Sequence, residues 1–321
     1  MRINRVCILG GSGFVGQHLV ARLAADRIAC RVVTRHPERH RDLQVLPGVE
    51  LVAANLFNPQ ALTQVLGGCQ VVINLVGILN ESGRHATFDK LHVGLVEAIA
   101  QAAPPAGVRR FLQMSGLNAD AGQGVSRYLR SKGAGEEAAH RLAASGIQVT
   151  SFRPSVIFGR GDSFFNRFAT LLSWTPGIFP LACPKARLAP VFVGDVVEAM
   201  ARALSQEEAA GQRYDLCGPA EYSLLELVRY TARLIGWQGV VIGLPAGLSW
   251  FQAALLGLAP GRPFTRDNYR SLQVPSVCRH NGLTNLGIEP TAIQTEVPPY
   301  LAAASERDRY LNIRATLPEG P

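Results

Sequence analysis

The chain has 321 residues, of which 47% are hydrophobic and 17% are charged. This composition suits one large globular domain or two unequal ones, and it excludes a disordered chain. The 32 Lys and Arg residues outnumber the 24 Asp and Glu residues and give a net charge of +8, which suits an anionic ligand or lipid. Because no helix-turn-helix, zinc or aromatic-basic RNA motif accompanies that charge, no nucleic-acid partner is expected.

The first half of the chain, over residues 5–151, alternates short apolar runs with longer helical patterns. That alternation predicts an α/β fold, a doubly wound parallel sheet of the Rossmann-like type with helices on both faces. The last helix is expected from near Ser126 to Ala144, before Gly146. The predicted strands are RVCIL from Arg5, ACRVVT from Ala29, VELVA from Val49, QVVINLV from Gln70, RRFLQM from Arg109 and IQVTSF from Ile147.

Beyond Arg153 the elements become shorter and richer in proline and glycine, which predicts a smaller C-terminal lobe. We assign residues 1–155 to an NAD(P)-binding domain and residues 156–321 to a lobe for substrate or partner. Some segments of this lobe are expected to return to the first sheet. The shorter elements include LAPVFVGDVVEAMARAL, which has the pattern of a strand followed by a helix.

One stretch of the second lobe, residues 240–259, is long and apolar enough to raise the question of a membrane. Pro245, Ser249 and Gln252 interrupt it, and Trp250 lies in its middle, whereas an interfacial aromatic residue belongs near the end of a span. We therefore expect a core helix of the small lobe, ahead of an interfacial helix and, last, a true span.

The six cysteines lie far apart, without a C-x-x-C pair, and three of them fall inside apolar strand-like runs. We therefore expect buried, reduced thiols in a cytoplasmic protein, without disulfides or zinc. The histidines are scattered, so no metal site is predicted. Because a strand and a glycine-rich turn follow closely on Met1, no signal or transit peptide is expected.

A glycine-rich turn, GGSGFVG, follows the first strand directly and opens a helix. Gly10 permits the tight turn, Gly13 lets the backbone approach a pyrophosphate, and Gly16 lets the helix pack on the sheet. The helix N-terminus attracts the phosphates, so Phe14 and Val15 at its start are counted among the cofactor-binding residues. The strand before and the helix after this turn favour a dinucleotide site over a simple tight turn.

The end of the second strand carries VVTRHPER where an NAD site would carry an acidic residue. Thr34 is neutral and small, and Arg35 is a cation. A carboxylate would repel a 2′-phosphate, whereas a guanidinium bonds it bidentately. NADP(H) is therefore favoured over NAD(H), with a solvated basic loop as the alternative interpretation.

The stretch SRYLRSK sets Tyr128 and Lys132 four residues apart, on one face of the predicted helix. A free tyrosine has a pKa of about 10, and a nearby ammonium lowers it by stabilising the phenolate. The pair is therefore a candidate acid–base unit. Ser115 ends the fifth strand in FLQMSG, where its hydroxyl could bond the same substrate oxygen as the phenol.

These motifs together resemble the extended branch of the short-chain dehydrogenase/reductase superfamily over essentially the whole chain. INLVG at the fourth strand, Glu136 after the lysine and FRPSVIFGRGD from Phe152 add to the likeness. The resemblance implies that Tyr128 is the proton donor or acceptor, that Lys132 holds the nicotinamide ribose and depresses the tyrosine pKa, and that Ser115 orients the substrate. The further cofactor-binding residues that it implies are Asn55, Leu75, Val76, Gly77, Pro154, Ser155 and Val156.

A narrower resemblance is to atypical members related to the NADPH-binding accessory subunit of respiratory complex I. It is carried by YLRSKGAGE, by RPSVIFGRGD and by the late pattern PFTRDNYRSL…LGIEP…YL over residues 263–301. It implies association with a respiratory complex or with the inner face of a membrane, and a cofactor held for structure. Bacterial relatives are often not part of such a complex, so a catalytic role is still a possible interpretation of the resemblance.

Three functions follow from these patterns. The preferred one is an NADP(H)-dependent oxidoreductase acting on a carbonyl or a quinone, because Ser115, Tyr128 and Lys132 are all present. The second is a non-catalytic NADPH-binding protein of an assembly, and the third is a sugar-nucleotide epimerase or dehydratase. The oligomeric state is not predicted.

Overall fold

The expected parallel sheet is present in the computed structural model, which describes residues 3–259 and 261–302. It has seven strands in the order β11-β6-β5-β4-β1-β2-β3, and every neighbouring pair is parallel. The boundaries of the six predicted strands agree with it to within two residues, whereas β11 was not among the predicted strands. The strands are β1 (Arg5–Leu9), β2 (Ala29–Thr34), β3 (Val49–Ala53), β4 (Val71–Asn74), β5 (Arg110–Met114), β6 (Gln148–Pro154) and β11 (Arg213–Leu216).

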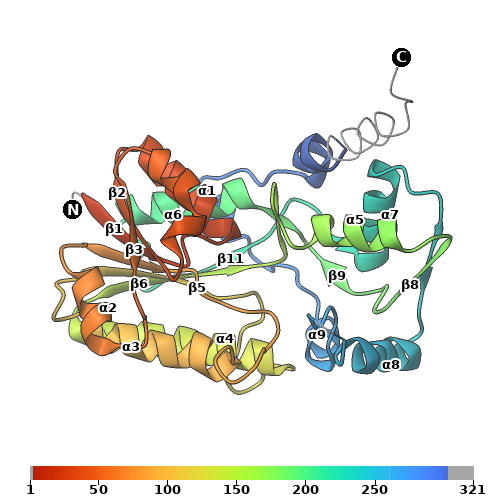
Figure 1. Cartoon of the computed structure of the whole chain (residues 1–321), viewed down its shortest axis with the longest axis horizontal. Coiled ribbons are helices and arrows are strands. Elements are labelled where there is room, and N and C mark those ends of the chain that lie inside the picture. Colours follow the sequence, from red (N-terminus) through yellow and green to blue (C-terminus); the bar gives the residue numbers. More distant parts are fainter. Residues whose placement is uncertain (1–2, 260, 303–321) are drawn as a thin grey trace, which may run out of the picture.

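Two hydrophobic cores form on the two faces of this sheet because successive side chains of a strand point to opposite sides. In β1, Val6 and Ile8 belong to one core, and Cys7 and Leu9 belong to the other. Figure 1 shows helices over both faces, α1 and α6 on one and α2, α3 and α4 on the other. The doubly wound fold is therefore confirmed. Its helices are α1 (Phe14–Ala25), α6 (Val193–Ser205), α2 (Pro59–Leu66), α3 (Leu95–Ala102) and α4 (Arg127–His140).

Local signals explain where the helix that carries the tyrosine and lysine begins and ends. The side chain of Ser126 accepts a hydrogen bond from the N–H of Leu129 and so caps the first turn of α4. A 3₁₀ segment continues α4, and Gly146 then adopts φ 77°, the left-handed conformation that ends helices. The short helical segments are η1 (Pro37–Arg39), η2 (Arg41–Val45), η3 (Asp89–Gly94), which is a π-helix, and η4 (Arg141–Ser145).

The remaining elements form a smaller group beside the carboxyl end of the sheet, at the right of Figure 1. They share a third core, built around Phe158, Phe165 and Val228. Three two-stranded sheets, β10–β7, β12–β9 and β13–β8, belong to this group. Its strands are β7 (Ile157–Phe158), β8 (Ile178–Leu181), β9 (Arg187–Leu188), β10 (Val191–Phe192), β12 (Tyr222–Ser223) and β13 (Val240–Gly243). Its helices are α5 (Phe165–Trp174), α7 (Leu224–Leu234), α8 (Ala246–Leu256) and α9 (Arg266–Ser271). Helix α10 (Gly282–Asn285) instead packs against β11 of the main sheet, and its Leu283 belongs to the first core.

The expectation of a core helix over residues 240–259 is wrong. The segment is strand β13 followed by α8, and only Ser249 and Ala253 of α8 are buried. Phe251 and Leu255 are 61% and 59% exposed. The apolar residues were expected to face the core, but α8 turns its largest side chains outward. Across the described ranges, no helix combines the length and the apolar character needed to cross a membrane.

The expectation of six reduced cysteines is also wrong, because Cys217 and Cys278 form a disulfide. The two are 61 residues apart in sequence. Cys217 follows β11, and the Asn281 side chain donates to its carbonyl oxygen and accepts from its N–H, which brings the late segment against the sheet. The other four cysteines are free and buried.

Candidate functional site

The glycine-rich turn forms a tight cradle at the carboxyl ends of β1 and β4. Gly10 has φ 80°, and a Cβ on it would lie 3.1 Å from the carbonyl carbon of Leu75 and from the nitrogen of Val76. A Cβ on Gly16 would lie 2.5 Å from the carbonyl oxygen of Gly10. Gly13 is the N-cap of α1 and offers no side-chain cap, so the amide groups of the first turn are available to an anion. The turn therefore fits a dinucleotide pyrophosphate.

Thr34 and Arg35 lie beside that cradle because β2 pairs with β1, Leu9 opposite Val33. Thr34 is buried, and its hydroxyl accepts from the N–H of His36. Arg35 is exposed, and no described residue forms a hydrogen bond or ion pair with its guanidinium. In dinucleotide-binding folds, a residue at this position contacts the adenosine ribose and responds to the charge of a 2′-phosphate on it.

The other cofactor-binding residues implied by the resemblance lie at the ends of further strands. Asn55 follows β3, is exposed, and accepts from the N–H of Phe57 with its own side chain. Leu75, Val76 and Gly77 follow β4, and a Cβ on Gly77 would lie 3.0 Å from Nζ of Lys132. The β4 loop therefore runs directly past the lysine.

Pro154, Ser155 and Val156 stand at the end of β6. The Ser155 hydroxyl donates to the carbonyl oxygen of Ser276 at 2.7 Å, so it is turned toward the C-terminal lobe. Any contact of Ser155 with a cofactor is thus left to its backbone.

Ser115, Tyr128 and Lys132 converge at the end of β5, as the spacing indicated. Lys132 Nζ donates to the carbonyl oxygen of Met114 at 3.1 Å. The Tyr128 hydroxyl would lie 3.5 Å from a Cβ on Gly116. Among the described residues, the Ser115 hydroxyl is the fully buried side-chain polar atom that has no hydrogen-bond partner. A buried polar group without a partner is costly in a protein, and a ligand oxygen would satisfy it.

Burial controls the protonation of the pair. It raises the pKa of Tyr128 to about 12. Burial also lowers the pKa of Lys132 to about 8, and the nearby Glu136 carboxylate partly opposes this shift. The expected depression of the tyrosine pKa by the lysine is therefore not found, because desolvation of the phenolate outweighs the ammonium. The phenol is protonated at neutral pH and has a proton to donate.

Two buried side chains hold the pair in place. Glu136 is buried and paired with two arginines, with Arg153 Nη2 and Arg213 Nε each 2.8 Å from its Oε1, which ties α4 to β6 and β11. His92 accepts from the N–H of Ile78 at 3.1 Å and lies 2.8 Å from the Ser131 hydroxyl. Burial and the charge of Lys132 lower the pKa of His92 to about 3, so it is neutral. His92 is thus a buried, satisfied histidine that links the β4 loop to α4.

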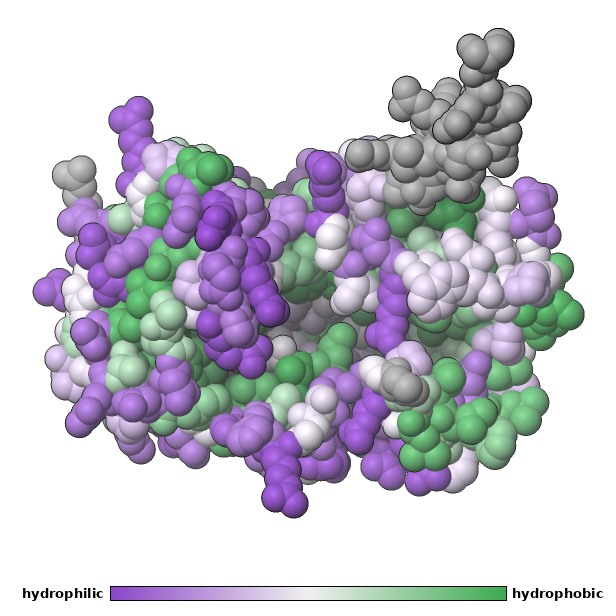
Figure 2. All heavy atoms as spheres, viewed as in Figure 1, coloured by the Kyte–Doolittle hydropathy of each residue, from purple (hydrophilic) through white to green (hydrophobic). Residues whose placement is uncertain are grey.

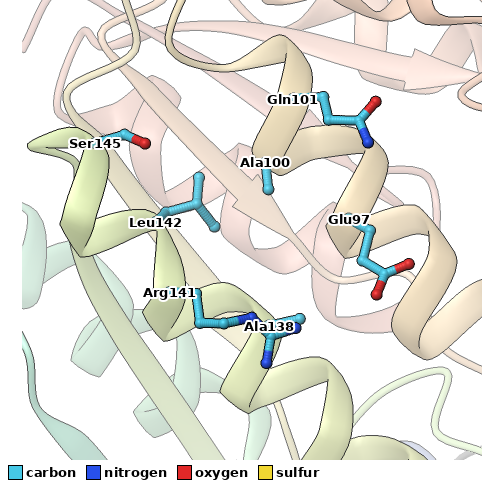
Figure 3. Close-up of a pocket in the computed structure, with 7 residues that line it drawn as sticks. All are labelled: Glu97, Ala100, Gln101, Ala138, Arg141, Leu142 and Ser145. Carbon is cyan, nitrogen blue, oxygen red and sulfur yellow. The ribbon is translucent and has the colours of Figure 1, made fainter.

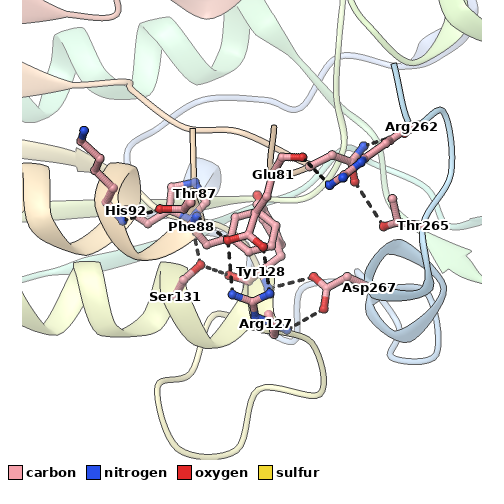
Figure 4. A network of polar contacts seen from close by, with 12 residues as sticks. Glu81, Thr87, Phe88, His92, Arg127, Tyr128, Ser131, Arg262, Thr265 and Asp267 are labelled. Atoms are coloured by element: carbon pink, nitrogen blue, oxygen red, sulfur yellow. Dashed lines mark hydrogen bonds and ion pairs between the residues drawn. The ribbon is translucent and has the colours of Figure 1, made fainter. Parts of the chain in front are cut away.

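A polar network that the sequence did not reveal closes one side of the site (Figure 4). The carboxylate of Asp267, on α9, accepts from the N–H groups of Arg127 and Tyr128 at 2.7 and 2.9 Å. Arg127 forms an ion pair with Glu81 at 2.8 Å, and Arg262 donates to the Glu81 carbonyl oxygen at 2.9 Å. The C-terminal lobe therefore caps the first turn of the helix that carries Tyr128.

Two pockets differ in their relation to these residues. One of about 120 Å³ lies within the network of Figure 4, next to Tyr128. A larger one, of about 360 Å³, lies between α3 and the end of α4 and shares no lining residue with the candidate site (Figure 3). It is lined by Glu97, Ala100, Gln101, Ala138, Arg141, Leu142 and Ser145.

Comparisons with known proteins show which family the chain resembles. A family model described as NAD(P)H-binding matches residues 10–162. The NADH dehydrogenase [ubiquinone] 1 alpha subcomplex subunit 9 of Rattus norvegicus mitochondria is 31% identical over 305 residues, covering 89% of this chain and 77% of the relative. The ceramide reductase of Caulobacter vibrioides is 31% identical over 248 residues, covering 75% and 73%.

A solved structure shows the same fold. It is an NADPH-dependent quinone oxidoreductase of Escherichia coli in complex with NADPH, which matches with a TM-score of 0.71 at 19% identity and covers 94% of this chain and 99% of its own. At that identity the likeness concerns the fold alone.

Proposed function

Because this chain belongs to the short-chain dehydrogenase/reductase superfamily, in the branch with subunit 9 of the NADH dehydrogenase 1 alpha subcomplex, we propose that it is an NADP(H)-dependent oxidoreductase. Its substrate in this proposal is a carbonyl compound or a quinone. The observation that carries the proposal is the unpartnered, buried hydroxyl of Ser115 beside the protonated phenol of Tyr128.

Each of the three residues has a role that its surroundings support. The Ser115 hydroxyl donates to the substrate oxygen and holds it against β5. Tyr128 gives its proton to that oxygen as the carbonyl becomes an alcohol. Lys132 places an ammonium near the phenol and so favours the phenolate that this transfer leaves. A reduced nicotinamide, when bound, supplies the hydride that the carbonyl carbon receives.

The preference for NADP(H) over NAD(H) rests on Arg35. Its guanidinium is exposed, stands beside the glycine-rich turn, and has no carboxylate partner among the described residues. A 2′-phosphate would provide that partner.

The second candidate function is a cofactor-bound component of an assembly, without turnover. It is favoured by the similarity to a respiratory-chain subunit over most of both chains. Association with a respiratory complex, and a place at the inner face of a membrane, belong to this candidate and are compatible with the first.

Steady-state oxidation of NADPH by a panel of ketones and quinones distinguishes the two functions. We expect turnover with at least one acceptor, and a loss of about 100-fold or more in Tyr128→Phe with NADPH affinity kept. Tyr222→Phe, in the C-terminal lobe, is the matched control and should keep the wild-type rate. Tight NADPH binding with no acceptor oxidised would support the non-catalytic component instead.

A further inference from the structure

An exposed apolar surface lies on the C-terminal lobe, and we call it the α8 face. Its members are large hydrophobic side chains of α8, of the residues just after it and of the adjoining β8–β13 sheet, each at least 46% exposed. Figure 2 shows apolar residues gathered over α8, at the lower right of the view. The members are Ile178, Val240, Ile242, Leu248, Trp250, Phe251, Leu255 and Leu258.

Helix α8 directs its apolar side toward the solvent, whereas a typical surface helix directs that side toward the core. Leu248, Phe251 and Leu255 follow one another at spacings of three and four, so they form one outward stripe. The opposite side is small and polar: the Ser249 hydroxyl accepts from the N–H of Cys183 at 3.1 Å and donates to the carbonyl oxygen of Leu244 at 3.2 Å. These two bonds hold the helix with its apolar side in solvent, and such a patch marks an interaction surface.

Exposed cations lie on the segments next to this face. The guanidinium of Arg266 lies over the ring of Trp250, 4.5 Å from its centroid. Lys185, Arg262 and Arg270 are exposed nearby, and none of the four forms an ion pair within the described residues. The carboxylate of Asp267 is occupied by the first turn of α4. The face thus joins an apolar stripe to a net positive rim.

We propose that the α8 face docks on an anionic lipid bilayer. Apolar side chains enter the boundary between headgroups and acyl chains, and the rim of cations meets the headgroup phosphates. A ring stacked with a guanidinium suits that boundary, because the ring is amphipathic and the charge remains in water. A protein partner or a second copy of this chain would instead have to supply carboxylates to four separate cations.

Docking there would bring the site close to the lipid. Helix α9 packs against both α8 and α4, and its Asp267 holds the N–H of Tyr128. If the proposed function holds, the carbonyl or quinone substrate would be a lipophilic molecule taken from the bilayer, and this inference about the substrate rests on that proposed function. The docking itself requires no turnover.

Vesicle flotation of the full chain tests the proposal. We expect binding to phosphatidylcholine vesicles that contain phosphatidylglycerol, weaker binding at high salt, and little binding to pure phosphatidylcholine. The double variant Phe251→Ser, Leu255→Ser should lose about tenfold or more in partitioning. Arg266→Gln with Arg270→Gln should lose about fivefold for each cation removed. Val45→Ser, at an 81% exposed position on the other lobe, is the matched control and should bind like wild type.

Absence of binding to anionic vesicles, or wild-type binding by both double variants, would overturn the proposal. Light scattering gives a second opposing outcome, namely a wild-type dimer that Phe251→Ser, Leu255→Ser converts to a monomer. NADPH oxidation by a water-soluble acceptor is measured on the same variants. A variant that no longer binds vesicles but still oxidises NADPH would show that membrane docking and catalysis are independent. Either proposal can therefore fail without the other.

Discussion

Lys132→Met should make the protein more stable at neutral pH while abolishing its turnover. Lys132 is 6% exposed, and burial lowers its pKa from 10.5 to about 8. At about 1.4 kcal/mol for each pKa unit, keeping this ammonium buried and charged costs about 3 kcal/mol below pH 8. Removing its hydrogen bond to the Met114 carbonyl oxygen costs about 1 kcal/mol. We therefore expect a net gain of about 2 kcal/mol in the free energy of unfolding.

The gain has a definite pH dependence. Below pH 8 the lysine is protonated in both the folded and the unfolded chain, so the burial penalty is fully present. Between pH 8 and 10.5 the unfolded chain binds more protons than the folded one, so the wild-type stability rises with pH. The advantage of Lys132→Met should therefore shrink across that window.

Urea unfolding followed by circular dichroism, at a series of pH values, measures the difference. Lys185→Met, at an exposed position, is the matched control and should change stability by less than about 0.5 kcal/mol. The claim that burial destabilises the Lys132 ammonium would be refuted by either of two results. In one, Lys132→Met is less stable than wild type at pH 7, and in the other, the gain in unfolding free energy is the same at every pH. A substitution that raises stability and abolishes activity is the result expected when the replaced residue serves function at a cost in stability.

Three further predictions concern the same site. Arg35→Asp should shift the preference from NADPH toward NADH in binding titrations, and an unchanged ratio would mean that the ribose charge is read elsewhere. The rate of carbonyl reduction should fall as pH rises through about 8, because Lys132 loses its charge there, and a flat profile beyond that pH would contradict its role. Asp267→Asn should lower thermal stability by about 1 kcal/mol by weakening the cap on Arg127 and Tyr128, whereas an unchanged melting curve would show the cap to be unimportant.

The parts of the fold that depend on local pattern could be predicted from the sequence. The strands β1 and β4 are short apolar runs that are buried along almost their whole length, and the polar residues around such runs mark where they begin and end. Ser126 caps α4, and Gly146 ends the helical run, so both ends of that segment followed from single residues. The grouping of Ser115 with Tyr128 and Lys132 followed because the carboxyl end of a parallel strand meets the next helix at one edge.

The parts that depend on distant partners could not be predicted. The pairing of Cys217 with Cys278 and the contact of Asp267 with α4 join segments that no periodicity relates. The spacing of Leu248, Phe251 and Leu255 reveals one stripe, but not whether that stripe faces the core or the solvent. The predicted direction of the Tyr128 pKa shift was wrong for a related reason, because that direction depends on how fully the folded chain excludes water from the phenol.

The most direct test of the central claim is a single-turnover measurement on the purified chain. NADPH bound to excess protein is mixed with ketone or quinone acceptors, and the loss of nicotinamide absorbance is followed in wild type and in Tyr128→Phe. The proposed site predicts acceptor-dependent loss in wild type and about 100-fold slower loss in the variant. Equal rates in the two proteins, or no loss with any acceptor despite tight NADPH binding, would contradict a catalytic Tyr128.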